Sequence, residues 1–208
     1  MNPNSLLNLN GRPLILASGS PRRASLLKLV GFEFEVKASQ LDERNEAYAV
    51  PEVHVLELSQ KKAWKVAETI KDGLIVGADT IVVLDSQILG KPDSPAQARE
   101  MLRRLSGYTH TVYTGLAIVA QPGGRTISDY EKTDVTFRNL SDTEIEQYVE
   151  TKSPLDKAGS YGIQDQGALF VSKVNGCFYN VMGFPLSKFY SLLRSFVKLK
   201  QCGVTRDK

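Results

Sequence analysis

The polar turn SGSPRR at residues 18–23 combines residue types that bind phosphate. An apolar run precedes it and an amphipathic segment follows, so the turn is predicted to lead from a strand into a helix. Backbone N–H groups at a helix start attract anions, and the guanidinium groups of Arg22 and Arg23 can form paired hydrogen bonds with phosphate oxygens. With Ser18 and Ser20 they predict an oligophosphate site, although no Walker motif is present. The alternative is an ordinary helix cap, because Ser-Pro is common at helix starts.

Asp79 interrupts the most hydrophobic part of the chain, between the runs LIVGA and TIVVL. A carboxylate beside buried strands is costly unless it is paired or bound to a cation. The glycine of the GAD sequence would also let a ligand approach the backbone closely. The alternative is that Asp79 faces solvent in a turn.

Four further charged residues are weaker candidates. Lys91 is enclosed by a glycine and a proline in GKP, whereas Lys62 lies in a segment with helical periodicity. Lysines in such positions are usually solvated. Asp42 and Glu43 can help Asp79 to hold a metal ion, although acidic residues in a polar loop usually need no special explanation.

Gln164 stands between strand-like runs in SYGIQDQGALFV. Its amide has both donors and an acceptor, so it can pair with the edge of uracil or thymine, which also presents both. An ordinary loop glutamine is the alternative. The two histidines, His54 and His110, lack paired ligands at zinc spacing, and no Ser-His-Asp or Cys-His set is indicated by order and spacing.

These candidate residues need strands and helices to position them. Patterning predicts strands over 12–18, 32–36, 110–121 and 125–140, and helices over 21–30, 51–71, from Pro95, after the Ser141 capping box, and from Pro185. Residues 74–92 are predicted to form a strand, a break at residues 77–79, a second strand and a hairpin at Asp85-Ser86. The segment from Tyr161 to Val181 suggests further strands. The mixture favours an α/β fold with a mixed sheet.

Composition is that of an ordinary globular protein. The 208 residues suit one domain or two closely packed lobes, and the net charge of +3 is too small to argue for nucleic acid. No apolar run approaches the roughly 20 residues of a membrane span, and the N-terminus lacks the features of a signal peptide. The two cysteines match no metal or redox motif. A cytoplasmic enzyme or binding protein is therefore expected.

In combination, the motifs resemble those of the Maf-like nucleoside triphosphate pyrophosphatases. The matching motifs are SGSPRR, DE at 42–43, KKA, GADT, GKP, LSGYTHTVYTG, DKAGSYGIQ and NVMGFPL, and the resemblance runs from about Arg12 to Leu199. It implies a domain over 12–199 with an extension at 1–11 and a tail at 200–208. The implied fold is like that of inosine triphosphate pyrophosphatases, an elongated mixed sheet with helices in two lobes around a cleft. The implied reaction is hydrolysis of a nucleoside triphosphate to the monophosphate and pyrophosphate with a divalent cation, Mg²⁺ or Mn²⁺.

The resemblance also implies roles for individual residues. Asp79 matches the family's catalytic carboxylate, and Asp79 with Glu43 would hold the metal ion. The implied substrate-binding residues are Ser18, Ser20, Arg22, Arg23, Glu43, Lys62 and Lys91. Arg22, Thr80 and Gln164 match the subgroup that acts on dTTP and UTP rather than on 7-methyl-GTP. Asp165 departs from the pattern, because many relatives have glycine there.

Two other functions remain open from the sequence. One is a nucleotide-binding regulator of septum formation or cell division that does not hydrolyse its ligand. The other is a nucleic-acid binder that uses Arg103, Arg104 and the basic tail, although no aromatic-basic strand motif supports it. The resemblance favours a soluble cytoplasmic enzyme with a nucleoside triphosphate substrate and a homodimeric state, and neither nucleic acid nor a membrane is an expected partner.

Overall fold

The computed structural model describes residues 3–7, 9, 11–42 and 50–201. The chain divides into two compact units. Unit 1 contains the residues up to Asp79, Gly115–Tyr130 and the residues from Gly183 onward, and unit 2 contains Thr80–Thr114 and Glu131–Met182. Each unit is described by itself below.

A seven-stranded sheet is the framework of the fold. The order is β2-β1-β3-β5-β6-β7, with β4 paired to β3. β1 is parallel to β2 and to β3, whereas β3–β4 and β6–β7 are antiparallel, so the predicted mixed α/β sheet is confirmed. The strands are β1 Leu14–Leu16, β2 Glu35–Val36, β3 Gly73–Leu84, β4 Gln87–Leu89, β5 Thr109–Gln121, β6 Arg125–Phe137 and β7 Val171–Asn175.

The helices begin where the sequence signals predict. Ser94 Oγ accepts a hydrogen bond from Gln97 N at 3.2 Å, and Ser141 and Glu144 form both halves of a capping box. Among the described residues, no helix combines the length and apolar composition needed to span a membrane. The α-helices are α1 Pro3–Leu7, α2 Pro21–Leu29, α3 Pro51–Ala67, α4 Pro95–Leu105, α5 Asp142–Glu150, α6 Phe178–Val181 and α7 Leu186–Gln201, and the 3₁₀ helices are η1 Ser153–Asp156, η2 Ala158–Ser160 and η3 Gln166–Phe170.

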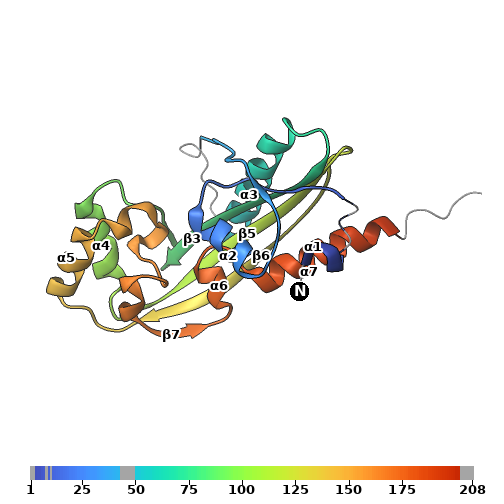
Figure 1. Ribbon diagram of the computed structural model, residues 1–208. Helices are drawn as coiled ribbons and strands as arrows, with labels where there is room; N and C mark the ends of the chain where they lie inside the picture. Colours follow the sequence, from blue (N-terminus) through green and yellow to red (C-terminus); the bar gives the residue numbers. More distant parts are fainter. Residues whose placement is uncertain (1–2, 8, 10, 43–49, 202–208) are drawn as a thin grey trace, which may run out of the picture. The chain divides into compact units, whose positions relative to one another are not determined.

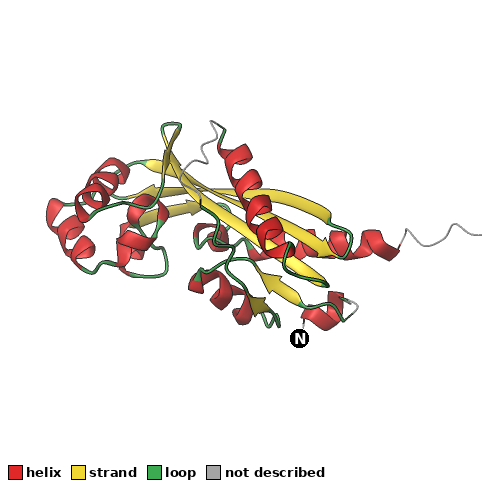
Figure 2. Ribbon diagram, turned by 90° about the horizontal axis from the view of Figure 1, so that it is seen from above, coloured by secondary structure: helices red, strands yellow, loops and turns green. Residues whose placement is uncertain are grey.

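In unit 1, helix α3 packs directly against strands of the sheet. Figure 2 shows it as a long red helix that lies over the yellow strands. Its apolar face meets a core formed by small and branched residues, namely Ile15, Ala17, Ala63, Val66, Ala67, Ile75, Ala117 and Val119. A Cβ added at Gly115 of β5 would lie 2.1 Å from the Val55 carbonyl oxygen, so the absence of a side chain there permits the close packing.

The N-terminal segment is also part of unit 1. Helix α1 lies against α7 (Figure 1), and Leu7 and Leu9 are buried. Asn4 Nδ2 donates to the Glu33 carbonyl oxygen at 2.8 Å, and Glu33 N donates back to Asn4 Oδ1 at 3.1 Å. The predicted domain boundaries at residues 11 and 199 stay predictions.

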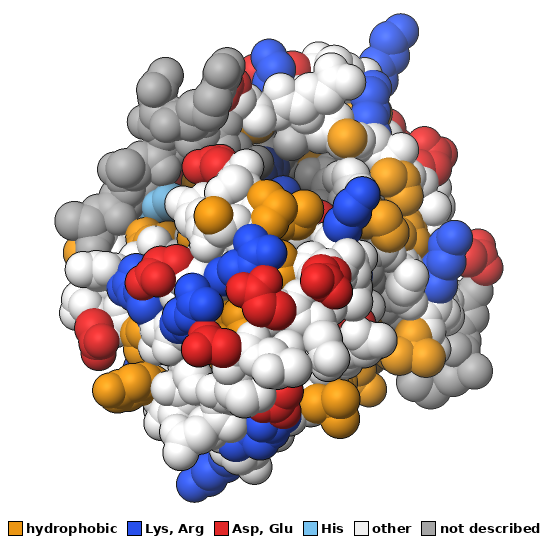
Figure 3. Space-filling view, turned by 90° about the vertical axis from the view of Figure 1, so that its left-hand side faces the viewer, with side chains coloured by type: hydrophobic (Ala, Val, Ile, Leu, Met, Phe, Trp, Pro, Cys, Tyr) orange, Lys and Arg blue, Asp and Glu red, His pale blue; other side chains and the backbone are white. Residues whose placement is uncertain are grey.

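In unit 2, helices α4 and α5 pack over an aromatic core. Phe137 and Tyr161 meet edge to face with ring centroids 4.8 Å apart. On the surface, Arg103 Nε lies 2.8 Å from Asp142 Oδ1. Figure 3 shows basic and acidic side chains interspersed over the face that it draws. Arg104 donates to Gln87 Oε1 at 2.7 Å. The two arginines considered for nucleic acid therefore both contact side chains of this unit.

Three predictions of secondary structure were wrong or only partly right. β3 continues without a break through residues 77–79. The predicted strand 32–36 is reduced to the two exposed residues of β2. The segment from Tyr161 to Val181 contains only one strand, β7, which lies between η3 and α6. The hairpin at Asp85-Ser86 is confirmed, with φ values of 49° and 62° as a type I′ turn requires.

Candidate functional site

Asp79 is a buried carboxylate in the middle of β3, not a solvent-facing turn residue. It is 5% exposed. Its Oδ1 accepts a hydrogen bond from Lys62 Nζ at 2.6 Å, and its Oδ2 lies 3.9 Å from His54 Nε2. Within the described part of the chain, Oδ2 accepts no hydrogen bond. A buried acceptor without a donor is uncommon and indicates a functional position.

Helix α3 places both basic groups beside this carboxylate. His54 and Lys62 are eight residues apart, which is a little over two helical turns, so they share one face. The prediction that glycine in the GAD sequence admits a ligand was wrong for Gly77. A Cβ there would lie 2.0 Å from the Ser59 carbonyl oxygen and 2.8 Å from Ala63 N. The backbone of helix α3 therefore packs against Gly77.

The SGSPRR turn lies at the start of α2 as predicted. Ser20 occupies the N-cap position with Pro21 at the first turn, but its side chain makes no capping hydrogen bond. Ser20 N donates instead to Ser18 Oγ at 3.3 Å. The Ser20 side chain therefore caps none of the backbone N–H groups of the first helical turn. The alternative that Ser20 is an ordinary helix cap lacks the hydrogen bond that defines such a cap.

Arg23 joins this turn to the strand that carries Asp79. Its Nη1 donates to Ser18 Oγ at 3.0 Å and to the Ala78 carbonyl oxygen at 2.9 Å, and its Nε donates to the Gly183 carbonyl oxygen at 2.9 Å. Arg23 therefore fixes the spacing between the turn and Asp79. Arg22, the other arginine of the pair, is half-buried.

Three of the residues predicted to form the substrate site belong to unit 2. Thr80 Oγ1 lies 3.0 Å from Thr114 Oγ1, and either hydroxyl can be the donor. Lys91 and Gln164 are exposed. The structure thus brings Ser18, Arg23, Lys62 and Asp79 together in unit 1, while Glu43 lies outside the described residues.

The sequence interpretation missed two polar residues. The spacing of the histidines excludes a zinc site and assigns His54 no other role, although its distance in sequence from Lys62 indicates a shared helix face. Asn180, fully buried in unit 2, donates from Nδ2 to the Val112 carbonyl oxygen at 2.9 Å and to Thr133 Oγ1 at 3.0 Å. Asn180 lies in the NVMGFPL motif, and nothing in the local sequence pattern indicates that it is buried.

The described residues can supply only part of the ligand set of a divalent cation. No three His, Cys, Asp or Glu residues gather into a metal site in the part of the chain that the structure describes. Asp79 Oδ2 nevertheless has no protein donor there, and Mg²⁺ commonly binds through one or two carboxylates plus substrate phosphates. Asp79 is therefore suited to supply one ligand, with the rest coming from the substrate and solvent.

Comparisons with known proteins give consistent matches over most of the chain. The family model described as "Maf-like protein" matches residues 13–196. The "dTTP/UTP pyrophosphatase" of Bacillus cereus (strain AH820) is 50% identical over 185 residues, which cover 89% of this chain and 96% of that protein. A Bacillus anthracis protein of the same name gives the same values. The Bacillus cereus (strain ATCC 10987 / NRS 248) protein of that name is 49% identical over 187 residues, covering 90% of this chain and 91% of the relative.

Proposed function

Because the chain belongs to the Maf-like protein family, we propose that it hydrolyses dTTP and UTP to the monophosphate and pyrophosphate. The names of its half-identical relatives support this substrate choice. The observation that carries the proposal is the buried Asp79, which is held through one oxygen by Lys62 while its other oxygen accepts no hydrogen bond from the described residues. A fixed carboxylate with an available lone pair can take a proton from an attacking water.

In the proposed reaction, water attacks the α-phosphorus and pyrophosphate leaves. Asp79 orients the water through Oδ2 and accepts its proton, while Lys62 holds Oδ1 and keeps the carboxylate in one orientation. Catalysis of phosphoryl transfer depends mainly on positioning and on neutralising charge on the phosphate oxygens. Ser18, Ser20, Arg22 and the first-turn N–H groups of α2 bind the phosphates, and Arg23 positions the turn that presents them.

Asp79 and Glu43 would hold a divalent cation, Mg²⁺ or Mn²⁺, whose positive charge would neutralise charge on the phosphate oxygens. Lys91 would contribute a further positive charge. Arg22, Thr80 and Gln164 would determine the preference for uracil and thymine nucleotides. A homodimeric state and a cytoplasmic location complete the proposal.

The decisive variant is Asp79→Asn. We expect kcat for UTP and dTTP to fall at least about 10³-fold, since the amide cannot accept the proton of the attacking water. Asp72→Asn is the matched control, because Asp72 is also a carboxylate of unit 1 but its side chain is 60% exposed and pairs with Arg12 at 3.3 Å rather than with a residue of the site. Thermal unfolding of both variants reports whether the fold is kept. Near-normal turnover by a folded Asp79→Asn protein would refute the assignment.

The substrate class is tested by measuring pyrophosphate release with Mg²⁺ and Mn²⁺ across canonical and modified nucleoside triphosphates. Release from dTTP and UTP in preference to the purine nucleotides is the expected result. Binding without release from any nucleotide would favour a nucleotide-sensing regulator instead. A preference for 7-methyl-GTP would contradict the proposed subgroup.

A further inference from the structure

Asp79 Oδ2 and His54 Nε2 lie close together in the buried part of unit 1. The two atoms are 3.9 Å apart, and the side chains are 7% and 11% exposed. This separation is too long for a hydrogen bond, which joins nitrogen and oxygen at about 2.7–3.2 Å. Two atoms that bind one metal ion at about 2.0–2.2 Å each can be up to about 4.3 Å apart. One cation can therefore bridge this pair.

Helix α3 is held against the sheet close to both of its basic residues. A Cβ added at Gly115 of β5 would lie 2.1 Å from the carbonyl oxygen of Val55, the residue that follows His54. A Cβ added at Gly77 of β3 would lie 2.8 Å from the backbone nitrogen at position 63, directly after Lys62. Close packing of this kind leaves the helix little room to move. The backbone of His54 is therefore fixed relative to the strand that carries Asp79.

Lys62 engages the other oxygen of the same carboxylate. Its Nζ donates to Asp79 Oδ1 at 2.6 Å, whereas Oδ2 accepts no hydrogen bond from the described residues. Carboxylates that ligate a metal are themselves hydrogen-bonded, and this fixes their orientation. A carboxylate oxygen also has two lone pairs, so Oδ2 can bind a cation and still accept the proton of an attacking water.

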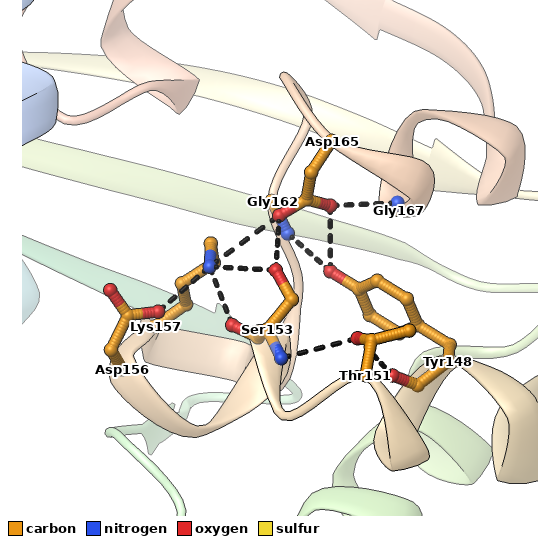
Figure 4. A network of polar contacts seen from close by, with 8 residues as sticks. All are labelled: Tyr148, Thr151, Ser153, Asp156, Lys157, Gly162, Asp165 and Gly167. Carbon is orange, nitrogen blue, oxygen red and sulfur yellow. Dashed lines mark hydrogen bonds and ion pairs between the residues drawn. The ribbon is translucent and has the colours of Figure 1, made fainter.

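Asp165 of unit 2 shows what a carboxylate without room for a cation looks like in this protein (Figure 4). Its Oδ1 accepts hydrogen bonds from Tyr148 OH and from Gly167 N, both at 2.8 Å. Its Oδ2 accepts one from Ser153 Oγ at 2.7 Å and lies 3.4 Å from Lys157 Nζ. Both oxygens of Asp165 are engaged by protein groups, unlike Oδ2 of Asp79.

The two donor atoms decide which cations fit the site. Mg²⁺ prefers oxygen ligands alone, whereas an imidazole nitrogen favours the later first-row metals, and affinity rises from Mn²⁺ to Co²⁺. No third His, Cys, Asp or Glu completes the set within the described ranges of the chain. The site is therefore open, as catalytic metal sites are, and water or phosphate oxygens supply the remaining ligands.

We propose that His54 ligates the divalent cation together with Asp79, and that this nitrogen ligand makes the site prefer Mn²⁺ and Co²⁺ to Mg²⁺. The inference rests on the proposed function, because it adds a second kind of protein ligand to the cation of that reaction.

Mn²⁺ bound to the untagged protein reports this ligand directly. Pulsed electron paramagnetic resonance detects the ¹⁴N nucleus of a coordinated imidazole as a modulation of the spin echo. The chain has two histidines, His54 and His110. We expect the modulation in the wild-type protein, with Mn²⁺ alone or with inorganic pyrophosphate added, and its loss in His54→Gln. His110→Gln is the matched control, because His110 is also buried but hydrogen-bonds to Tyr161 in unit 2. This variant should keep the modulation.

Calorimetric titration with each metal alone measures the preference. We expect His54→Gln to lower the affinity for Co²⁺ about 10²-fold and that for Mg²⁺ less than about threefold, because an amide oxygen replaces the imidazole nitrogen. Asp79→Asn should weaken the binding of both metals, and Asp165→Asn of neither. Thermal unfolding shows which variants are folded. If His54→Gln does not fold, the modulation in His110→Gln decides, since His54 is then the one histidine left.

A wild-type Mn²⁺ complex without the ¹⁴N modulation would overturn the inference. So would a folded His54→Gln protein that keeps either the modulation or the wild-type ratio of Co²⁺ to Mg²⁺ affinity. If the wild-type protein hydrolyses UTP without the modulation, the inference fails and the proposed function stands. If the modulation depends on His54 but no nucleotide releases pyrophosphate, the metal ligand stands and the proposed hydrolysis fails.

Discussion

Lys62 and Asp79 form an ion pair in which both side chains are almost fully buried, at 10% and 7% exposure. Moving two charges out of water costs several kcal/mol for each ion, and their attraction does not reliably exceed that cost. An apolar pair in this position would often be at least as stable. The retention of charge here is better explained by chemistry at Asp79 than by stability.

His110 is a second buried polar residue, and it predicts how stability depends on pH. Its Nε2 lies 2.8 Å from Tyr161 OH, and burial lowers the pKa of His110 to about 4, although the charge of Asp134 opposes this. In the unfolded chain its pKa is about 6.5, so the unfolded state binds more protons between these values. The stability contributed by neutral His110 is fully present above pH 6.5 and is lost as the pH falls towards 4.

We therefore expect the free energy of unfolding to fall by up to about 3 kcal/mol more in the wild-type protein than in His110→Gln over that pH range. Urea denaturation at a series of pH values measures the difference. Because carboxylates titrate in both proteins, only the difference between them reports on His110. Parallel curves for the two proteins would contradict the assignment.

At the scale of elements, the position of α3 depends on the missing side chain at Gly77. A methyl group there would lie 2.0 Å from the Ser59 carbonyl oxygen of α3. Either the helix must move away or the backbone at residue 77 must be distorted. Overpacking of this kind costs about 1–3 kcal/mol, and here it would also move Lys62 and His54 relative to Asp79. We expect Gly77→Ala to lower both stability and kcat.

Gly90→Ala is the matched control, since a Cβ there would meet no atom of the described residues within 4 Å. Chemical denaturation and steady-state turnover are measured for both proteins. A Gly77→Ala protein with wild-type stability and activity would show that the packing of α3 does not determine the site.

Local signals predicted the helices well but predicted β3 poorly. The helix starts at Ser94 and Ser141 depend on hydrogen bonds between residues three positions apart, so a short stretch of sequence predicts them. Both are confirmed. Gly77 and Asp79 are unusual in a strand, so they suggested a break, and only the packing of α3 explains why the strand continues. In the same way, the sequence pointed to Asp79 and Lys62 separately. Their contact, and the role of Arg23 between three segments, depend on tertiary structure.

At the scale of the whole molecule, the first residues do not behave as a detached extension. Leu7 and Leu9 are buried, and Asn4 exchanges two hydrogen bonds with Glu33. Burial of two leucines against unit 1 predicts that deleting residues 1–11 lowers the free energy of unfolding by about 2–4 kcal/mol. Asn4→Ala should cost only about 1 kcal/mol. Denaturant unfolding measures both, and unchanged stability of the deletion protein would mean that the segment contributes nothing.

Arg23 donates to Gly183, 160 residues further along the chain, and this separation has a consequence for synthesis. All of unit 2 has been translated once Met182 is added, whereas unit 1 still lacks α7 and its buried Phe189 and Phe196. Because domains generally fold as units during synthesis, unit 2 can fold before unit 1 is complete. The SGSPRR turn is therefore among the first segments to leave the ribosome and among the last to acquire its native contacts.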